Sequence, residues 1–354
     1  MPLNNGVMRR RMELCWALGI FTIAVSLSQA QANEPDPGGT SVGLAQSLQQ
    51  KAEAGDSGAQ YEVGLYAEQR GDYREAFKWF QLAAKQGLNG AQVDLAYLYV
   101  TGFGTEKDLE QAAHWYSLAA AQGNSNGEYS LGICYLHGEG VEQNLALARK
   151  WISLALAHGD GARSTNAMGL TYEIGPEEDL TEAFNWYNKA ATMGYAEAQY
   201  NVCRLTAQGL VSAADYAGAI KWCSTLAESG DPWGQYGLAR IFEQGVGMAP
   251  DLPKAAEWYK KSAEQGNPAA QFSLAAMYAN GKGVRQDLAE AYKWAAIAAA
   301  KKHPEAPDVL ETLSSHMTKR QISTAQSLVR KWIEEHPLDP ESSQTLDHVV
   351  YNRP

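Results

Sequence analysis

The sequence predicts an all-α fold, a right-handed α-solenoid of about seven two-helix repeats followed by a C-terminal capping helix. A tryptophan recurs every 35 or 36 residues, and a glycine follows each of the first six tryptophans by eight residues. Within each unit, apolar residues recur at spacings of three and four, the pattern of an amphipathic helix. One two-helix unit cannot bury its aromatic face alone, so stacking of units is expected. The tryptophans are Trp79, Trp115, Trp151, Trp186, Trp222, Trp258 and Trp294.

Each unit of the repeat divides into two predicted helices. The first carries a Gln or a substitute, such as Gln92, then an apolar residue and a small residue. A turn rich in glycine follows, as in 102–104 and 281–283. The second helix starts near an acidic residue such as Asp108, which suits a helix N-terminus by capping and by the helix dipole. A boundary glycine such as Gly123 ends it with a left-handed conformation.

The consensus of these units is A-x-Q-x-x-L-G-x-x-Y, then G-x-G-V-x-x-D, then A-x-x-W-Y-x-x-A-A. This pattern resembles the Sel1-like repeat, a relative of the tetratricopeptide repeat, over about residues 52–301. Three turns depart from it and are expected to differ in shape: Arg70-Gly71-Asp72, Gly175-Pro176-Glu177 and Gly209-Leu210-Val211.

The segments outside the repeats have their own expected roles. Residues 1–32 contain three arginines (9–11), an apolar run (14–27) and Ala30-Gln31-Ala32, the order of a secretory signal peptide. An uncleaved N-terminal anchor is the alternative. We therefore expect a periplasmic or secreted protein, with no membrane span once the signal is cleaved. Residues 33–51 are expected to form a flexible lead-in and the start of the first helix, 302–336 capping helices, and 337–354 a mobile tail.

Composition argues against several classes of function. With 29 basic and 40 acidic residues and a net charge of −11, the chain lacks the basic surface that nucleic acid requires. The seven histidines show no H-x-x-x-H spacing, so we expect no metal site. The G-x-G turns follow helices rather than strands, which favours turns over phosphate binding. Neither S-x-x-K nor G-x-S-x-G occurs, and we expect no catalytic residue and no cofactor.

The cysteines leave one question open. Cys203 and Cys223 fall on the two helices of the fifth unit, so a disulfide between them is conceivable. The alternative is two small buried residues that never pair, because disulfide geometry is strict. Cys134 lies on an apolar helix position and is expected to serve packing.

A partner would bind on the concave face, which the first helices line by analogy with tetratricopeptide arrays. The candidate residues combine aromatic rings with arginine, the types that dominate interface energetics. They are Tyr200, Arg204, Trp233, Tyr236, Arg240 and Phe272. We expect an acidic or C-terminal peptide segment as the ligand. The alternative is that the aromatics pack against the next hairpin.

These observations favour an exported, non-enzymatic scaffold or regulator that binds a protein partner. Some Sel1-like proteins are cysteine-rich, and a β-lactamase or penicillin-binding activity has been attributed to that branch. The resemblance therefore implies an alternative, a cell-wall- or β-lactam-directed enzyme or binding protein. The absence of regular cysteine pairs argues against it. A secreted protein that binds a host protein is a third possibility. The sequence leaves the oligomeric state open.

Overall fold

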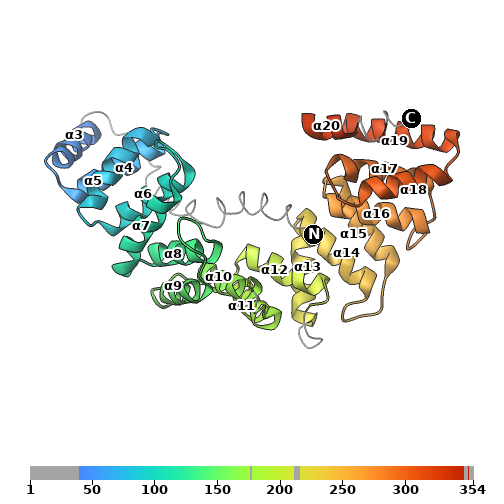
Figure 1. Ribbon diagram of the computed structural model, residues 1–354, viewed down its shortest axis with the longest axis horizontal. Coiled ribbons are helices and arrows are strands. Elements are labelled where there is room, and N and C mark those ends of the chain that lie inside the picture. The colour runs from blue at the N-terminus through green and yellow to red at the C-terminus, as the bar shows by residue number, and fades with distance from the viewer. Residues whose placement is uncertain (1–39, 176–177, 211–215, 347–349, 351–354) are drawn as a thin grey trace. The chain divides into compact units, whose positions relative to one another are not determined.

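The computed structural model describes residues 40–175, 178–210, 216–346 and 350, and all regular structure in these ranges is helical (Figure 1). The chain divides into two compact units, the first ending at Asp179 and the second starting at Leu180. The helices of the first unit are α3 (Thr40–Glu53), α4 (Ser57–Gln69), α5 (Tyr73–Lys85), α6 (Asn89–Thr101), α7 (Leu109–Ala121), α8 (Ser125–His137), α9 (Leu145–Ala157) and α10 (Ala162–Glu173). Those of the second are α11 (Leu180–Thr192), α12 (Ala196–Ala207), α13 (Tyr216–Glu228), α14 (Pro232–Gln244), α15 (Leu252–Glu264), α16 (Pro268–Asn280), α17 (Leu288–Ala300), α18 (Ala306–His316), α19 (Lys319–Glu335) and α20 (Pro340–Leu346).

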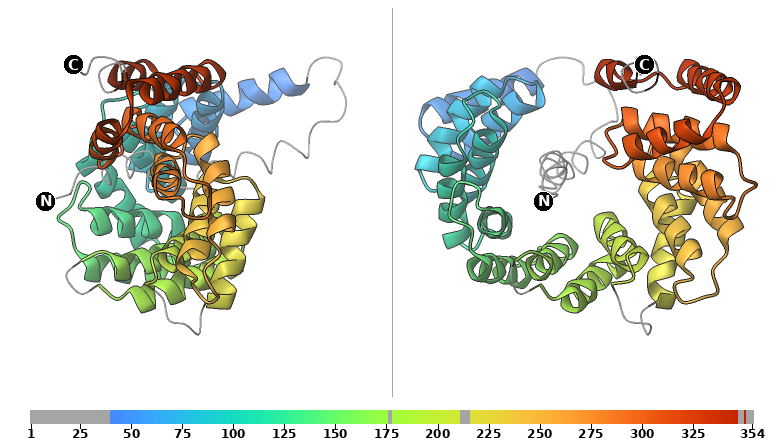
Figure 2. Two further views of the ribbon diagram at one scale, coloured as in Figure 1. Left: turned by 90° about the vertical axis from the view of Figure 1, so that its right-hand side faces the viewer. Right: turned by 45° about the vertical axis from the view of Figure 1, so that its right-hand side comes forward.

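Within each unit, consecutive helices lie side by side as a stack of hairpins (Figure 2). In the first unit these are α4–α5, α6–α7 and α8–α9, and in the second α12–α13, α14–α15 and α16–α17. The predicted all-α solenoid is confirmed. The predicted signal segment lies outside the described residues. Of the expected lead-in, residues 40–51 belong to α3, which packs on α4.

Aspartate caps start four of the second helices, as the acidic position predicted, and Asn144 caps a fifth. Asp72, Asp108, Asp251 and Asp287 each accept a hydrogen bond from a backbone N–H three residues later, at 3.0–3.1 Å. Such a cap satisfies one of the donors that the first helical turn leaves without a partner. Boundary glycines with positive φ follow these helices, as Gly123 does at 75°, except that Lys302 takes this conformation after α17, at 62°.

The G-x-G turns have a packing role that the sequence pattern did not reveal. In three of these turns, a Cβ atom at the second glycine would overlap the backbone carbonyl at the start of the preceding hairpin's second helix. Gly104 lies against Tyr73, Gly140 against Leu109 and Gly283 against Leu252. These glycines also have φ between 69° and 72°, a region that other residues seldom adopt. Each such turn therefore stacks one hairpin directly on the backbone of its neighbour.

The residue after the repeated tryptophan forms the core between hairpins. Phe80, Tyr116, Tyr187 and Tyr259 are fully buried, whereas most of the tryptophans are half-buried. The small residue of the first helix makes room for them. A Cβ atom at Gly132 would come within 2.7 Å of Ile152, so glycine lets α9 approach α8 closely.

Glutamine side chains connect the hairpins through a repeated set of hydrogen bonds. The Nε2 atoms of Gln60, Gln92, Gln235 and Gln271 donate to the carbonyl of an alanine eight residues earlier, at 3.1–3.3 Å. A second glutamine just after the hairpin's second helix donates back, as Gln122 does to Gln92 at 2.8 Å. The third repeat replaces both amides. There Glu128, with 2% of its side chain exposed, accepts from Nδ1 of His158 at 2.8 Å.

The C-terminal end differs from the expectation in one respect. Helices α18 and α19 pack on α17 and lie in the expected capping segment 302–336. The tail from Pro337 was expected to be mobile, but it contains α20, which also packs on α17. Leu346 and Val350 are only 3% and 4% exposed, so this short segment buries more apolar surface than its composition suggested. Residues 347–349 and 351–354 lie outside the described residues.

Candidate partner-binding face

The six predicted binding residues lie on three helices of the second unit. Helix α12 carries Tyr200 and Arg204, and α16 carries Phe272. Helix α14 carries Trp233, Tyr236 and Arg240, whose spacings of three and four place them on one side of the helix. All six side chains are half-buried, so each keeps part of its surface accessible.

The aromatic residues contact one another and the following elements. The rings of Trp233 and Tyr236 meet edge to face with centroids 6.0 Å apart, and Tyr236 also contacts Tyr259 of α15 at 5.7 Å. Phe272 stacks on His303 with centroids 4.2 Å apart, and burial lowers the pKa of this histidine. The buried part of each of these rings therefore packs against neighbouring elements, which is the alternative role given above for the aromatic residues.

The first unit uses the same repeat position in the same way. The hydroxyl of Tyr61 donates to Asp94 of the next hairpin at 2.7 Å. The guanidinium of Arg163 lies 4.0 Å from the ring centroid of Tyr129. The residue after the repeat glutamine, or its substitute, thus packs on a neighbouring helix or loop in both units, and at Tyr61 and Tyr129 the contact is with the following helix pair.

Arg240 is the charged group that best suits a ligand on this face. The amide oxygen of Gln244 lies 2.6 Å from its guanidinium, in the orientation that also places the Gln244 nitrogen 3.2 Å from the Ala207 carbonyl. Among the described residues, Arg240 forms no ion pair. The nearby Glu243 carboxylate instead accepts from the hydroxyl of Tyr259 at 2.6 Å. Burial, with that carboxylate, raises the pKa of Tyr259. Arg240 therefore holds its positive charge against a neutral amide.

A disulfide joins α12 to α13 in the same unit. It links Cys203 to Cys223, whose Cα atoms are 4.9 Å apart. The Cys203 sulfur also faces the next hairpin, because a Cβ atom at Gly237 of α14 would lie 2.6 Å from it. Cys134 is buried in α8, and burial raises the pKa of its thiol to about 12, so the thiol stays protonated at neutral pH.

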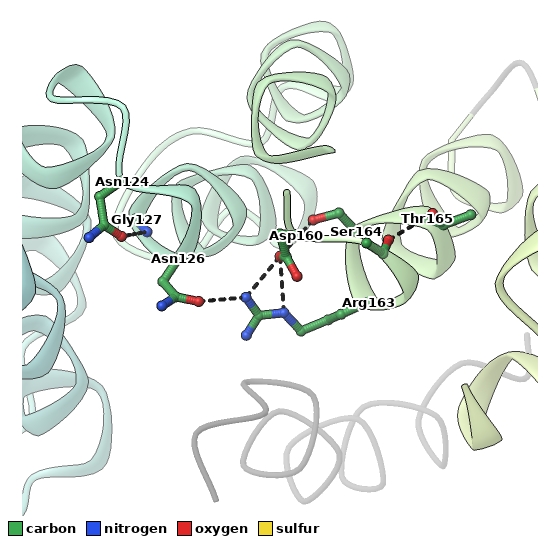
Figure 3. A network of polar contacts seen from close by, with 8 residues as sticks. Asn124, Asn126, Gly127, Asp160, Arg163, Ser164 and Thr165 are labelled. Atoms are coloured by element: carbon green, nitrogen blue, oxygen red, sulfur yellow. Dashed lines mark hydrogen bonds and ion pairs between the residues drawn. The ribbon is translucent and has the colours of Figure 1, made fainter. Parts of the chain in front are cut away.

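A polar network in the first unit was not anticipated from the sequence. Figure 3 shows Arg163 of α10 between Asp160 and Asn126. The guanidinium donates to Oδ2 of Asp160 at 2.8 and 3.1 Å and to Oδ1 of Asn126 on α8 at 2.8 Å. The hydroxyl of Ser164 donates to the same carboxylate at 2.7 Å. The network ties α8 to α10, and only the i,i+3 spacing of Asp160 and Arg163 could have suggested part of it.

Two further kinds of site were sought over the described ranges. No group of three or more His, Cys, Asp or Glu side chains in these ranges could hold a metal ion. No helix among them is both long and apolar enough to cross a membrane.

Solved structures of similar proteins were compared with this chain, and the first one below agrees with this architecture. A Sel1 repeat protein from Oxalobacter formigenes is 26% identical, with a TM-score of 0.61, and the match covers 83% of this chain and 91% of that one. The protective antigen c5321 of uropathogenic Escherichia coli strains, which displays an SLR fold, is 25% identical over 86% of this chain and 74% of that one, with a TM-score of 0.49. No curated protein matches the chain significantly.

The Sel1 repeat matches the chain seven times. The matched residues are 57–88, 90–124, 125–160, 162–195, 196–231, 234–267 and 268–303. These matches cover well over half of the chain. Six of them coincide with the hairpins described above, and the match over 162–195 comprises α10 of the first unit and α11 of the second. The chain therefore belongs to the Sel1 repeat family.

Proposed function

We propose that this protein is an exported, non-enzymatic scaffold that binds an acidic or C-terminal segment of a partner protein. Sel1 repeats form scaffolds that typically mediate protein interactions. The binding face that we propose comprises Tyr200, Arg204, Trp233, Tyr236, Arg240 and Phe272 on α12, α14 and α16, the helices expected to line the concave side of a solenoid.

The observation that carries this proposal is the environment of the Arg240 guanidinium. Its guanidinium contacts a neutral amide and, in the described part of the chain, no carboxylate. Two half-buried aromatic residues precede Arg240 on the same side of α14: Tyr236 by four residues and Trp233 by seven. A carboxylate on a ligand would gain a charge-assisted hydrogen bond, and rigid aromatic rings bury large areas at low entropic cost.

Export rests on two observations of different kinds. The first is the signal-like order of residues 1–32. The second is the Cys203–Cys223 disulfide, because disulfides persist mainly in oxidising compartments. Mass spectrometry of the protein recovered from the envelope and culture fractions would test this part, since cleavage after Ala32 gives a chain that begins at Asn33. A full-length chain in the cytoplasmic fraction would contradict export.

The binding proposal is tested by capturing partners from envelope extract with the chain from Asn33 onward. The wild type is compared with an Arg204→Ala/Arg240→Ala variant and with a control, Lys282→Ala/Arg285→Ala, that removes the same charge from an exposed turn. We expect a partner retained by wild type and control but lost from the first variant. Synthetic peptides from that partner's acidic segments then measure affinity directly. Equal capture by all three chains would refute this location of the site.

A further inference from the structure

Helix α4 of the first unit presents an exposed apolar pair that no described helix covers. Leu65 is 38% exposed and the adjacent Tyr66 is 60% exposed. Helices α3 and α5 pack on other sides of α4, where Ala59, Val63 and Ala67 are buried. A single exposed leucine is ordinary, but two adjacent large apolar side chains on a helix are less so.

Carboxylates flank this pair. Tyr61, Leu65 and Glu68 share one side of α4 by their spacings of four and three, and Glu62 lies one turn before Tyr66. Asp94 of α6 joins them, because the Tyr61 hydroxyl donates to its Oδ2 at 2.7 Å. We call Tyr61, Glu62, Leu65, Tyr66, Glu68 and Asp94 the α4 face.

Neither Glu68 nor Asp94 forms an ion pair with a basic side chain among the described residues. Burial raises the pKa of Glu68, and burial together with the Glu68 charge raises that of Asp94 to about 7. The Tyr61 hydrogen bond acts in the opposite sense on Asp94 but does not cancel the burial. A positive charge next to these groups would relieve their mutual repulsion and favour their ionised forms.

The distribution of charge along the chain points the same way. Residues 40–179 contain 18 acidic and only 9 basic residues, whereas residues 180–354 contain 19 acidic and 17 basic. The first unit therefore carries most of the negative charge of the repeat region. Its electrostatic field attracts cations and repels acidic segments.

We propose that the α4 face binds a cationic segment of a partner protein, with Lys or Arg side chains next to a large apolar residue. The apolar side chain covers Leu65 and Tyr66, and the basic side chains lie against Glu62, Glu68 and Asp94. This surface is separate from the one proposed on α12, α14 and α16, and it prefers a ligand of the opposite charge. A chain with both surfaces can hold two chemically different segments.

Fluorescence anisotropy with labelled peptides tests the proposal on the whole chain from Asn33 carrying Arg204→Ala/Arg240→Ala, which removes the positive charges of the other proposed face, so that binding of the Glu peptide there does not enter the comparison. The probe is a short amphipathic peptide of Lys and Leu, compared with one that has Glu in place of Lys and one that has Ser in place of Leu. We expect the Lys/Leu peptide to bind at least about tenfold more tightly than either, or about 1.4 kcal/mol. We also expect the affinity to fall as salt is added. No binding below about 1 mM, or equal binding of the Glu peptide, would overturn the proposal.

Matched variants locate the site. Leu65→Ser/Tyr66→Ser is expected to weaken binding by about tenfold, or 1.4 kcal/mol. The control Leu82→Ser/Leu118→Ser alters two leucines on α5 and α7 that are 44% and 37% exposed, and it should leave binding within about twofold.

A second pair of variants separates a local effect from the overall negative charge. Glu62→Gln/Glu68→Gln is compared with Glu106→Gln/Glu110→Gln, which removes two exposed carboxylates elsewhere in the same unit. Equal losses in these two variants would show binding to the general acidic surface, and equal losses in the two serine variants would show binding to exposed apolar residues in general. Either result would refute the α4 face. Circular dichroism melts establish that each variant is folded.

Discussion

Replacing the second glycine of a G-x-G turn by alanine tests whether these turns stack one hairpin on the next. Gly140 has φ of 69°, and a Cβ atom there would overlap the Leu109 carbonyl at the start of α7. Gly159 is the matched control in the same unit. Its φ is 95°, and no non-neighbouring atom lies within 4 Å of a Cβ atom built on it.

The two variants share one energetic cost and differ in another. Alanine in a left-handed conformation costs about 1 kcal/mol at either position. At Gly140 the new methyl group must also displace backbone at the interface between two hairpins, and such over-packing costs about 1–3 kcal/mol. We therefore expect Gly159→Ala to lose about 1 kcal/mol and Gly140→Ala about 2–4 kcal/mol.

Thermal unfolding followed by far-ultraviolet circular dichroism measures the difference. At roughly 2–4 °C per kcal/mol for a unit of this size, the two midpoints should be separated by several degrees. Tryptophan fluorescence reports the local change, because Trp115 lies on α7, whose start this turn contacts, and Trp151 lies on α9, which follows the turn. Equal midpoints for the two variants would refute the stacking role and leave only the backbone conformation of each glycine to explain its presence.

Three further predictions follow from the described contacts. His158→Ala should lower the free energy of unfolding by about 2 kcal/mol, measured by thermal unfolding, because buried Glu128 loses its partner. Glu128→Gln/His158→Gln should recover most of that stability, because it restores the amide pair of the other repeats. An equal loss in the double variant would contradict this. A reductant should lower the unfolding temperature of the wild type but not of Cys203→Ala/Cys223→Ala, since a loop of 20 residues is worth about 3 kcal/mol; equal sensitivity would argue against the bridge. The folded state raises the pKa of Asp94 from 3.8 to about 7, so the free energy of unfolding of the wild type should fall as pH rises from about 4 to 8. Urea unfolding measures this fall, and Asp94→Asn should flatten it. A wild type that gains stability over that range would show the opposite linkage.

Much of the fold was predictable because its signals are local. The spacing of tryptophan, glycine and small residues sets helix faces, caps and turns, and each depends on residues only a few positions apart. The repeat then multiplies a weak local signal seven times. The positions of Arg204 and Arg240 on the first helices of their hairpins could be predicted in the same way, since helical periodicity alone determines which side of a helix a residue occupies.

Contacts between hairpins could not be predicted in this way. Spacing placed Phe272 on a helix face, but not its stacking on His303. The exchange of two glutamines for Glu128 and His158 joins residues 30 apart, and it is visible only when the hydrogen bonds are compared between repeats.

The sequence by itself therefore determined the repeat, the helices and their capping residues, because these follow from short-range backbone geometry. Only the tertiary structure decided which partner each side chain meets: Asp94 against Tyr61, Arg163 against Asn126, and α20 against α17. The physical reason is that packing depends on interhelical distances of a few ångströms. Those distances are set by all the side chains of an interface together rather than by any local pattern.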